Sequence, residues 1–208
     1  MLLEALILDY GNVLSHPQRE DWFETMATQV GASANAFRDS YWRHRRPYDA
    51  GLPAAEYWRR VLKTLGQSSY ALDQEAVIDR LVKADVASWT EYREEVWDLA
   101  QSFRGKGGRT AFLSNGVLEA MARIRADRHL ERWFDVVVVS CEVGVAKPDP
   151  GIFRICLSRL GVEPARALFV DDRIENIEGA ASIGIQTFHF VGGDAVSRLA
   201  RAVRSLSG

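Results

Sequence analysis

The sequence has few of the features that mark secreted, disulfide-bonded or membrane proteins. Its 208 residues include only two cysteines, Cys141 and Cys156, which are too few for a disulfide framework and match no zinc-binding spacing. No apolar run approaches the roughly 20 residues that a membrane-spanning helix needs. The opening residues lack the basic segment that precedes the apolar stretch of a secretory signal. These absences favour a cytoplasmic protein without a membrane partner.

The charge balance also lacks a dominant sign. The chain has 26 lysines and arginines against 28 aspartates and glutamates, which gives a formal net charge of -2. This balance gives no reason to expect nucleic acid as a partner. The hydrophobic fraction of 47% is ordinary for a globular protein, and the length suits one domain that carries a smaller insertion. No pattern in the sequence indicates an oligomeric state.

Short apolar runs alternate with segments of helical spacing along much of the chain. The runs cover residues 3–8, 109–113, 135–139, 167–170 and 184–190. Nearly continuous apolar runs of this length are typical of strands that are buried on both faces. Strands that alternate with helices indicate parallel βαβ units. We therefore expect an α/β fold built on a doubly wound, Rossmann-like parallel sheet.

Residues 16–88 break this alternation. No strand pattern occurs there, and apolar residues recur at helical spacing in four segments. Ser33 precedes one of these segments and is expected to cap the N-terminus of its helix. The sequence therefore predicts a helical cap at 16–88 that is inserted into an α/β core formed by residues 1–15 and 89–208.

Polar residues stand at or soon after the ends of the predicted strands. Asp9, Ser114 and the pair Asp171–Asp172 follow apolar runs, and Lys147 comes shortly after another. In an open parallel sheet the carboxyl ends of the strands form one edge, where ligands bind. Carboxylates hold Mg²⁺, which also takes phosphate oxygens, and a carboxylate can attack phosphorus to form an aspartyl-phosphate. A hydroxyl and an ammonium group can bind the remaining phosphoryl oxygens.

Four motifs occur in an order that is similar to that of the haloacid dehalogenase superfamily. They are DYGNVL at 9–14, LSNG at 113–116, KPDPGIF at 147–153 and VDDRIENIEGA at 170–180. The helical segment between the first two motifs resembles the superfamily's helical cap of the first class. The resemblance implies a Mg²⁺-dependent hydrolase, above all a phosphatase that acts on a small phosphorylated metabolite similar to a sugar phosphate.

The resemblance also implies roles for the residues at the strand ends. Asp9 would be the nucleophile and a metal ligand, and the backbone carbonyl of Gly11 would be a second ligand. Asp172 would be the third protein ligand, with Asp171 in or beside the outer shell of the metal. Lys147 would neutralise charge on the phosphate and on the nucleophile.

The segment that begins at Ser114 is expected to bind the phosphoryl group. By the same resemblance, its hydroxyl and the backbone amides that follow, at Asn115 and Gly116, would contact the phosphoryl oxygens. The helix that follows also offers its N-terminus to an anion. Charge compensation of this kind is the main catalytic contribution in phosphoryl transfer.

One position departs from the superfamily's usual pattern. Most of its phosphatases carry a second aspartate two residues after the nucleophile, which protonates the leaving group and then activates water. Here that position is Gly11, and positioned acid–base catalysis typically contributes roughly 10²–10⁴ in rate. The superfamily includes Asp-x-Gly members close to sugar-phosphate phosphatases. His16, near the predicted hinge, is a candidate substitute for the missing acid, and a solvated hinge residue is the alternative.

Two other functions stay open, and Gly11 favours the first of them. One is a non-catalytic binding or regulatory protein that retained the fold and the metal site. The other is a haloacid dehalogenase, although that branch resembles Asp-x-Tyr-Gly at the first motif, whereas Tyr10 here directly follows Asp9. In the cap, residues 41–48 combine three arginines with three aromatic residues. Arg45 among them is a candidate for substrate binding, and the alternative is a solvated helix end whose aromatic residues pack against the cap.

Overall fold

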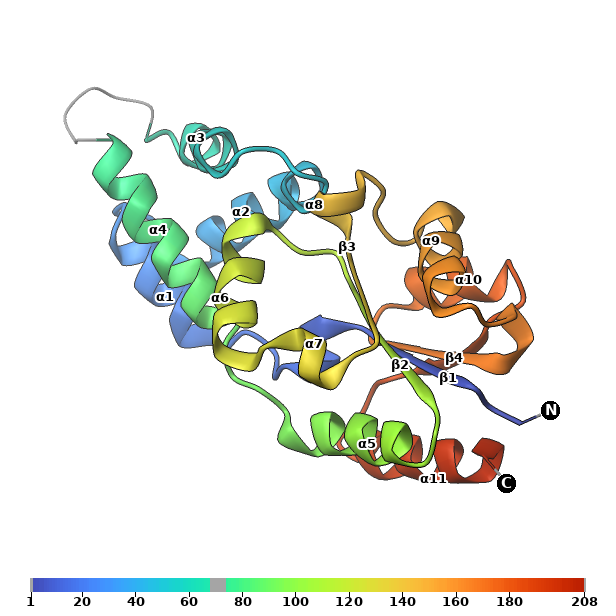
Figure 1. Ribbon diagram of the computed structural model, residues 1–208. Helices are drawn as coiled ribbons and strands as arrows, with labels where there is room; N and C mark the ends of the chain where they lie inside the picture. The colour runs from blue at the N-terminus through green and yellow to red at the C-terminus, as the bar shows by residue number, and fades with distance from the viewer. Residues whose placement is uncertain (1, 68–73, 208) are drawn as a thin grey trace.

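The computed structural model describes residues 2–67 and 74–207. Within them, five parallel strands form one sheet in the order β3-β2-β1-β4-β5 (Figure 1). Each strand overlaps an apolar run of the sequence, so the predicted parallel α/β sheet is confirmed. The strands are β1 (Ala5–Leu8), β2 (Arg109–Ser114), β3 (Val136–Val139), β4 (Ala167–Asp171) and β5 (Gln186–His189).

The strand order makes β1 the central strand and places the reversal of the winding beside it. The chain runs from β1 through β2 to β3 on one side, and then continues with β4 and β5 on the other side of β1. Ligands of open α/β sheets bind beyond the carboxyl ends of the strands at such a reversal. The residue that follows β1 therefore has the position in the fold where a reactive group is expected.

Helices cover both faces of the sheet. On β1, Leu6 and Leu8 pack into one apolar cluster, whereas Ala5 and Ile7 pack into the other. Figure 1 shows α9 and α10 on one side of the sheet, and α5 and α11 on the other. The core helices are α5 (Glu94–Gly105), α6 (Leu118–Arg128), α7 (Leu130–Trp133), α8 (Ser140–Val143), α9 (Pro150–Leu160), the 3₁₀ turn η2 (Pro164–Arg166), α10 (Ile174–Ala181) and α11 (Ala195–Ser207).

The segment between β1 and α5 is helical, where the sequence analysis predicted a cap. Ser33 caps the second of its helices, as predicted, by accepting a hydrogen bond from the amide of Ala36. The cap helices pack around the buried rings of Tyr41, Tyr57 and Trp58 and lie together beyond one end of the sheet (Figure 1). The segment comprises an irregular turn η1 (Tyr10–Leu14), α1 (Glu20–Thr28), α2 (Ala34–Asp49), α3 (Ala54–Thr64) and α4 (Gln74–Ser88).

The chain leaves the core and returns to it at one place. Ser15 and Tyr92 form an isolated antiparallel bridge, and the amide of His16 donates to the carbonyl of Glu91 at 2.7 Å. The two connections between core and cap therefore run side by side, which is the arrangement of a hinge. In the described part of the chain, no helix combines the length and the hydropathy that crossing a bilayer requires.

Candidate active site

Residues from separate motifs meet at one edge of the sheet. Asp9 follows β1, Ser114 ends β2 and Asp171 ends β4, and these three strands are neighbours. Asp172 comes next along the chain, and one oxygen from each of the three aspartates lies within 4.8 Å of the others. The Asp9 carboxylate also accepts a hydrogen bond from the amide of Tyr10 at 2.6 Å, which helps to orient it. Asp9 and Asp172, which the sequence analysis predicted as ligands of one metal ion, therefore lie close together.

Lys147 lies between two of these carboxylates. Its Nζ is 2.6 Å from Oδ1 of Asp9 and 2.7 Å from Oδ2 of Asp171, and it donates to the carbonyl of Leu113 at 3.1 Å. The amide group of the Asn115 side chain holds the backbone of Lys147 in a reciprocal pair. Asn115 Nδ2 donates to the Lys147 carbonyl at 2.9 Å, and Lys147 N–H donates to Asn115 Oδ1 at 2.8 Å. The side chain of Asn115 thus positions the lysine.

The site carries an excess of negative charge. Burial raises the pKa of Asp9 well above its ordinary value, and the charge of Asp171 raises it further against the opposing effect of Lys147. Burial also raises the pKa of Asp172, which a hydrogen bond from Asn12 opposes. For Lys147, burial lowers the pKa, but Asp171 and Asp9 outweigh burial and hold the pKa above its ordinary value. One ammonium group therefore faces three carboxylates.

Asp171 and Asp172 have different partners. The Oδ1 of Asp171 accepts from the amide of Arg173 at 2.8 Å, and both of its oxygens accept from Nδ2 of Asn176 at 3.0 Å. Asp172 Oδ2 accepts from Nδ2 of Asn12 at 2.6 Å. Asn12 has a φ of 60°, in the left-handed region that asparagine adopts more readily than most residues. This backbone conformation points a residue of the first motif at a residue of the fourth.

In the loop after β2, one backbone amide that the sequence analysis assigned to the phosphoryl group has a partner within the protein. Ser114 is buried and lines the cavity beside Asp9. The amide of Gly116, a predicted phosphoryl contact, donates to Oγ of Ser140 at 3.1 Å. A Cβ at Gly116 would lie 3.3 Å from side-chain atoms of both Met121 and Val139. Gly116 therefore lets the loop pack closely against α6 and β3.

The site opens into a cavity of about 720 Å³, counted with its opening to solvent. The predicted site residues Asp9, Ser114, Lys147 and Asp172 form one part of its lining. The first turns of α6 and the residue before them supply an apolar wall, which consists of Val117, Ala120, Met121 and Ile124. Side chains from the cap and its return segment close the cavity: Trp42, Arg45, Asp49 and Trp89.

Arg45 lines this cavity, but it is buried and already has partners. Its Nε donates to Oδ1 of Asp49 at 2.8 Å, and its NH1 group donates to the two oxygens of Asp85 at 3.3 and 3.2 Å. The guanidinium also lies 5.0 Å from the centre of the Tyr41 ring and 5.3 Å from that of Tyr48. Arg45 therefore does not lie at a solvated helix end, because residues 41, 45 and 48 lie on the buried face of α2. Tyr41 and Tyr48 pack inside the protein, as that alternative expected of the aromatic residues.

Gly11 lies at the site, whereas His16 does not line its cavity. Gly11 lines the cavity, and a Cβ there would lie 3.5 Å from the Trp89 ring, which is ordinary van der Waals contact. His16 is not among the residues that line this cavity, and its backbone takes part in the hinge. The structure brings together all the other predicted site residues, and His16 is not part of the cavity lining.

The motifs and their geometry agree with a comparison of the sequence with known families. Residues 3–184 match a family described as haloacid dehalogenase-like hydrolase. The chain belongs to this family. The segment that matches this haloacid dehalogenase-like hydrolase family includes parts of the core and the whole of the cap.

Curated relatives of this haloacid dehalogenase-like hydrolase include enzymes with different chemistry. The chain is 28% identical to (S)-2-haloacid dehalogenase 4A of Burkholderia cepacia over 77% of its own length and 72% of that protein. It is 36% identical to a phosphoserine phosphatase of Thermus thermophilus over 40% of its own length and 34% of that protein. A match of 45% identity to mouse acyl-CoA dehydrogenase family member 10 spans 40% of this chain and only 8% of that protein.

Solved structures of similar fold also come from this family. A HAD family enzyme from Bacteroides thetaiotaomicron has a TM-score of 0.74 at 20% identity, covering 96% of this chain and 98% of that one. A structure of that enzyme with magnesium and inorganic phosphate has a TM-score of 0.72, likewise at 20% identity, over 95% and 98% of the two chains. L-2-haloacid dehalogenase from Xanthobacter autotrophicus, with chloropropionic acid covalently bound, has a TM-score of 0.69 at 18% identity over 97% and 83%. At these identities the likeness establishes the fold.

The sequence analysis did not predict several residues of the site. Asn12 and Asn176 hold the two aspartates of the fourth motif, and both stand inside motifs that the sequence analysis quoted. Their polar side chains next to the expected ligands were the available signal. Asp49 and Trp89 line the cavity from outside the core motifs, and only the docking of the cap places them there.

Proposed function

We propose that this chain is a Mg²⁺-dependent phosphatase that acts on a small phosphomonoester, with Asp9 as the nucleophile. The observation that carries this proposal is the position of the Asp9 carboxylate. It lies beside the Lys147 ammonium, clustered with Asp171 and Asp172, at the wall of a cavity. A buried carboxylate next to a cation and further acidic oxygens suits nucleophilic attack on an electron-poor, anionic centre.

The donor set fits a magnesium ion. Mg²⁺ prefers oxygen ligands and is bound in proteins by one or two carboxylates together with substrate oxygens. Asp9 and Asp172 would hold it together with the backbone carbonyl of Gly11, and Asp171 would stand next to them. Because one ammonium faces three carboxylates, a divalent cation would offset the excess charge. When bound, the ion would polarise the phosphoryl group and neutralise the charge that develops on it.

The residues of the chain would divide the chemistry as follows. One oxygen of Asp9 attacks phosphorus, and the bond from phosphorus to the substrate's alcohol oxygen breaks. Lys147 opposes protonation of the nucleophile and, together with the Ser114 hydroxyl, binds oxygens of the transferred group. Water then attacks the phosphorus of the aspartyl-phosphate and releases Asp9 as a carboxylate. The cap limits the access of bulk water during these steps.

The cavity supports a small substrate with both apolar and polar parts. The wall formed by Val117 and the α6 residues can pack against carbon atoms, and the Arg45–Asp49 pair lies on the cap side. Specific pockets commonly combine an apolar lining with a few fixed polar groups. A sugar-like phosphate fits this description. The chain is also 38% identical, over 73 residues and 33% of that protein, to a phosphorylated carbohydrates phosphatase of Thermotoga maritima.

A haloacid dehalogenase is the second candidate. It is favoured by the relative in Burkholderia cepacia, of which the match covers 72%, and by Gly11, because a halide leaves without being protonated. The three clustered aspartates favour the phosphatase, since attack on a haloacid carbon needs no metal site. A binding or regulatory role is the third outcome if neither reaction occurs.

A panel of substrates tests these alternatives. Phosphate release is measured from aryl, sugar and amino-acid phosphates with Mg²⁺ or with EDTA, and chloride release from 2-chloropropionate. The proposal predicts Mg²⁺-dependent phosphate release that Asp9→Asn abolishes and that Asp79→Asn, at an exposed position of α4, leaves unchanged. Chloride release that is insensitive to EDTA would identify a dehalogenase. No turnover of any compound would contradict the proposed activity and favour the binding role.

A further inference from the structure

We propose that Asp49, the last residue of α2, is the proton donor to the leaving group, in place of the carboxyl group that Gly11 lacks. This inference rests on the proposed phosphatase function. Asp49 belongs to the cap, whereas Asp9 belongs to the core, yet both line the same cavity. The acid and the nucleophile would thus approach a bound phosphomonoester from different parts of the molecule.

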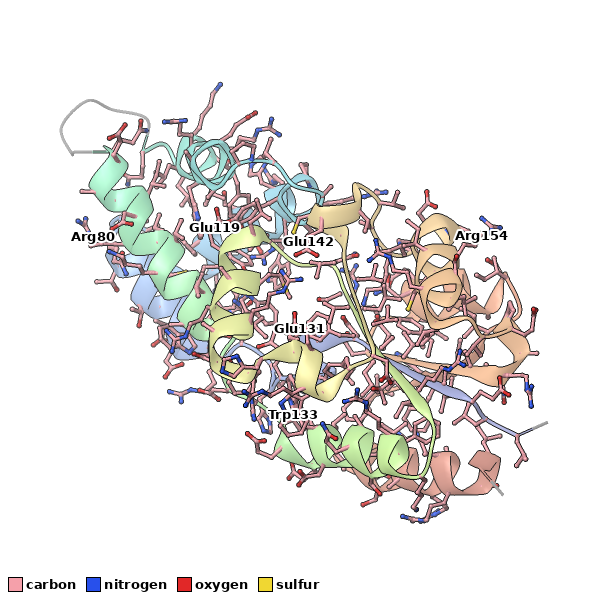
Figure 2. All side chains as sticks on the ribbon, viewed as in Figure 1. Arg80, Glu119, Glu131, Trp133, Glu142 and Arg154 are labelled. Atoms are coloured by element: carbon pink, nitrogen blue, oxygen red, sulfur yellow. The ribbon has the colours of Figure 1, made fainter. Side chains whose placement is uncertain are left out.

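The backbone of Asp49 is held by Ser140, the first residue of α8, which also binds the loop that follows β2. The Ser140 hydroxyl donates a hydrogen bond to the carbonyl of Asp49 and accepts one from the amide of Gly116. The preceding residue, Tyr48, donates from its hydroxyl to Oε2 of Glu119 at 3.0 Å. Figure 2 shows Glu119 at the start of α6, on the side of the cap. These contacts hold the Asp49 side chain at the cavity in the closed arrangement of cap and core.

The surroundings of Asp49 favour its protonated form. Burial raises the pKa of Asp49 above its ordinary value, and the negative charge of Asp85 adds to this effect against Arg45 and Arg173. Arg45 is shared, since its guanidinium also binds both oxygens of Asp85, which accepts a further hydrogen bond from the Tyr41 hydroxyl at 2.6 Å. One cation therefore serves two carboxylates: Asp85, which is buried, through two contacts, and Asp49, which is partly buried, through one.

The other ionisable residues that line the cavity are poor candidates for this role. Asp9, Asp172 and Lys147 are the proposed nucleophile, metal ligand and phosphoryl-binding group, and an arginine does not release its proton in a protein. The hydroxyl of Tyr10 donates to the carbonyl of Trp89, and burial raises its pKa far above the ordinary value. Among the described residues lining the cavity, Asp49 is the remaining carboxyl group.

The proton can be followed through both halves of the reaction. In the first half, the bond from phosphorus to the leaving oxygen breaks as Asp9 attacks, and the Asp49 carboxyl proton passes to that oxygen. The products are the free alcohol, an aspartyl-phosphate and ionised Asp49. In the second half, the Asp49 carboxylate takes a proton from the attacking water. Phosphate leaves, Asp9 is again a carboxylate, and Asp49 is again protonated.

The test compares two aryl phosphates that differ in the acidity of the leaving phenol. Phenyl phosphate needs protonation of its leaving oxygen much more than 4-nitrophenyl phosphate does. The value of kcat/KM reports the first half of the reaction up to its irreversible step. In Asp49→Asn, which keeps an oxygen that can accept from Arg45, we expect kcat/KM to fall about 10²–10³-fold for phenyl phosphate and only a few-fold for 4-nitrophenyl phosphate.

Asp85→Asn is the matched control, since Asp85 shares Arg45 but does not line the cavity. It should keep the wild-type ratio of the two substrates, while the fall of kcat/KM at high pH moves to lower pH because a charge that raises the pKa of Asp49 is gone. That fall should be absent in Asp49→Asn. Thermal unfolding checks that each variant is folded.

Each other outcome overturns the inference in a recognisable way. An equal loss on both substrates in Asp49→Asn assigns the residue to substrate binding or cap structure, and unchanged kinetics remove it from the reaction. In both of these cases the wild-type chain is an active phosphatase and the proposed function stands. If the wild-type chain hydrolyses neither ester nor any other phosphate of the panel above, the proposed function fails and this inference fails with it.

Discussion

Nζ of Lys147 lies 2.6 Å from Oδ1 of Asp9, and both side chains are buried. Removing the cation leaves Asp9, Asp171 and Asp172 without their shared positive partner. Breaking a buried ion pair on one side typically costs about 3–5 kcal/mol. We therefore expect Lys147→Met to lower the free energy of unfolding by that amount in urea denaturation with EDTA. Lys83→Met, at an exposed ion pair with Asp79, should change it by less than about 1 kcal/mol.

An equal, small effect of Lys147→Met and Lys83→Met would contradict the electrostatic description of the site. It would mean that the buried carboxylates have other sources of compensation. A loss of stability at Lys147 that shrinks as the pH falls would support the description, because the pKa of Asp9 is raised and protonation removes the unpaired charge.

Magnesium should stabilise the folded chain, because a ligand that binds only the folded state adds to the free energy of unfolding. The gain is about 2.7 kcal/mol when the free ion is at 100 times its dissociation constant. We expect the thermal midpoint of the wild-type chain to rise with Mg²⁺ and that of Asp172→Asn to rise far less. Asp194→Asn, which changes an exposed aspartate that pairs with Arg198, should behave like the wild type. A wild-type midpoint that ignores Mg²⁺ would argue against the metal site.

Asp49 should also make stability depend on pH. Its pKa is raised in the folded chain above the ordinary value of 3.8, so the folded state holds the proton more tightly than the unfolded state. The stabilisation that follows is fully present below 3.8 and is lost as the pH rises through the folded pKa. The stability of Asp49→Asn relative to the wild type should therefore increase over this interval in urea denaturation. A difference that is constant with pH, or that decreases, would disprove the raised pKa.

The sheet and the central residues of the site could be predicted from the sequence for a physical reason. Strands that are buried on both faces leave nearly continuous apolar runs, and parallel strands bring their carboxyl ends to one edge. Asp9, Ser114 and Asp171 are therefore placed by the strand order. Lys147 follows a longer connection, and the motif rather than the pattern of apolar residues identified it.

The rest of the site depends on contacts that leave little trace in the sequence. The left-handed conformation of Asn12 directs its side chain to Asp172, 160 positions away. Asp49 reaches the cavity because Ser140 and Glu119 of the core hold the end of α2. Such long-range pairs are set by how the cap docks. Neither apolar periodicity nor a motif reports that docking.

The close packing of α10 against Pro148, the residue after Lys147, gives a prediction at Gly179. A Cβ at this position would overlap the carbonyl of Pro148, directly after Lys147. Gly179→Ala should therefore lower the free energy of unfolding by about 1–3 kcal/mol, as overpacking commonly does, and should reduce turnover by moving Lys147. In Gly105→Ala, the new Cβ in α5 meets no atom within 4 Å, so stability should be unchanged or slightly higher. Equal behaviour of the two variants in urea denaturation would contradict this packing.

The most direct test of Asp9 as the nucleophile is chemical trapping of the intermediate. The chain is mixed with Mg²⁺ and a phosphomonoester that it hydrolyses, and the reaction is quenched rapidly. Treatment with borohydride then reduces an aspartyl-phosphate to homoserine. Mass spectrometry of the digested chain should find homoserine in place of aspartate at position 9, in a substrate-dependent amount and not in Asp9→Asn. Phosphate release without any homoserine at position 9, or with homoserine at another aspartate, would contradict the mechanism.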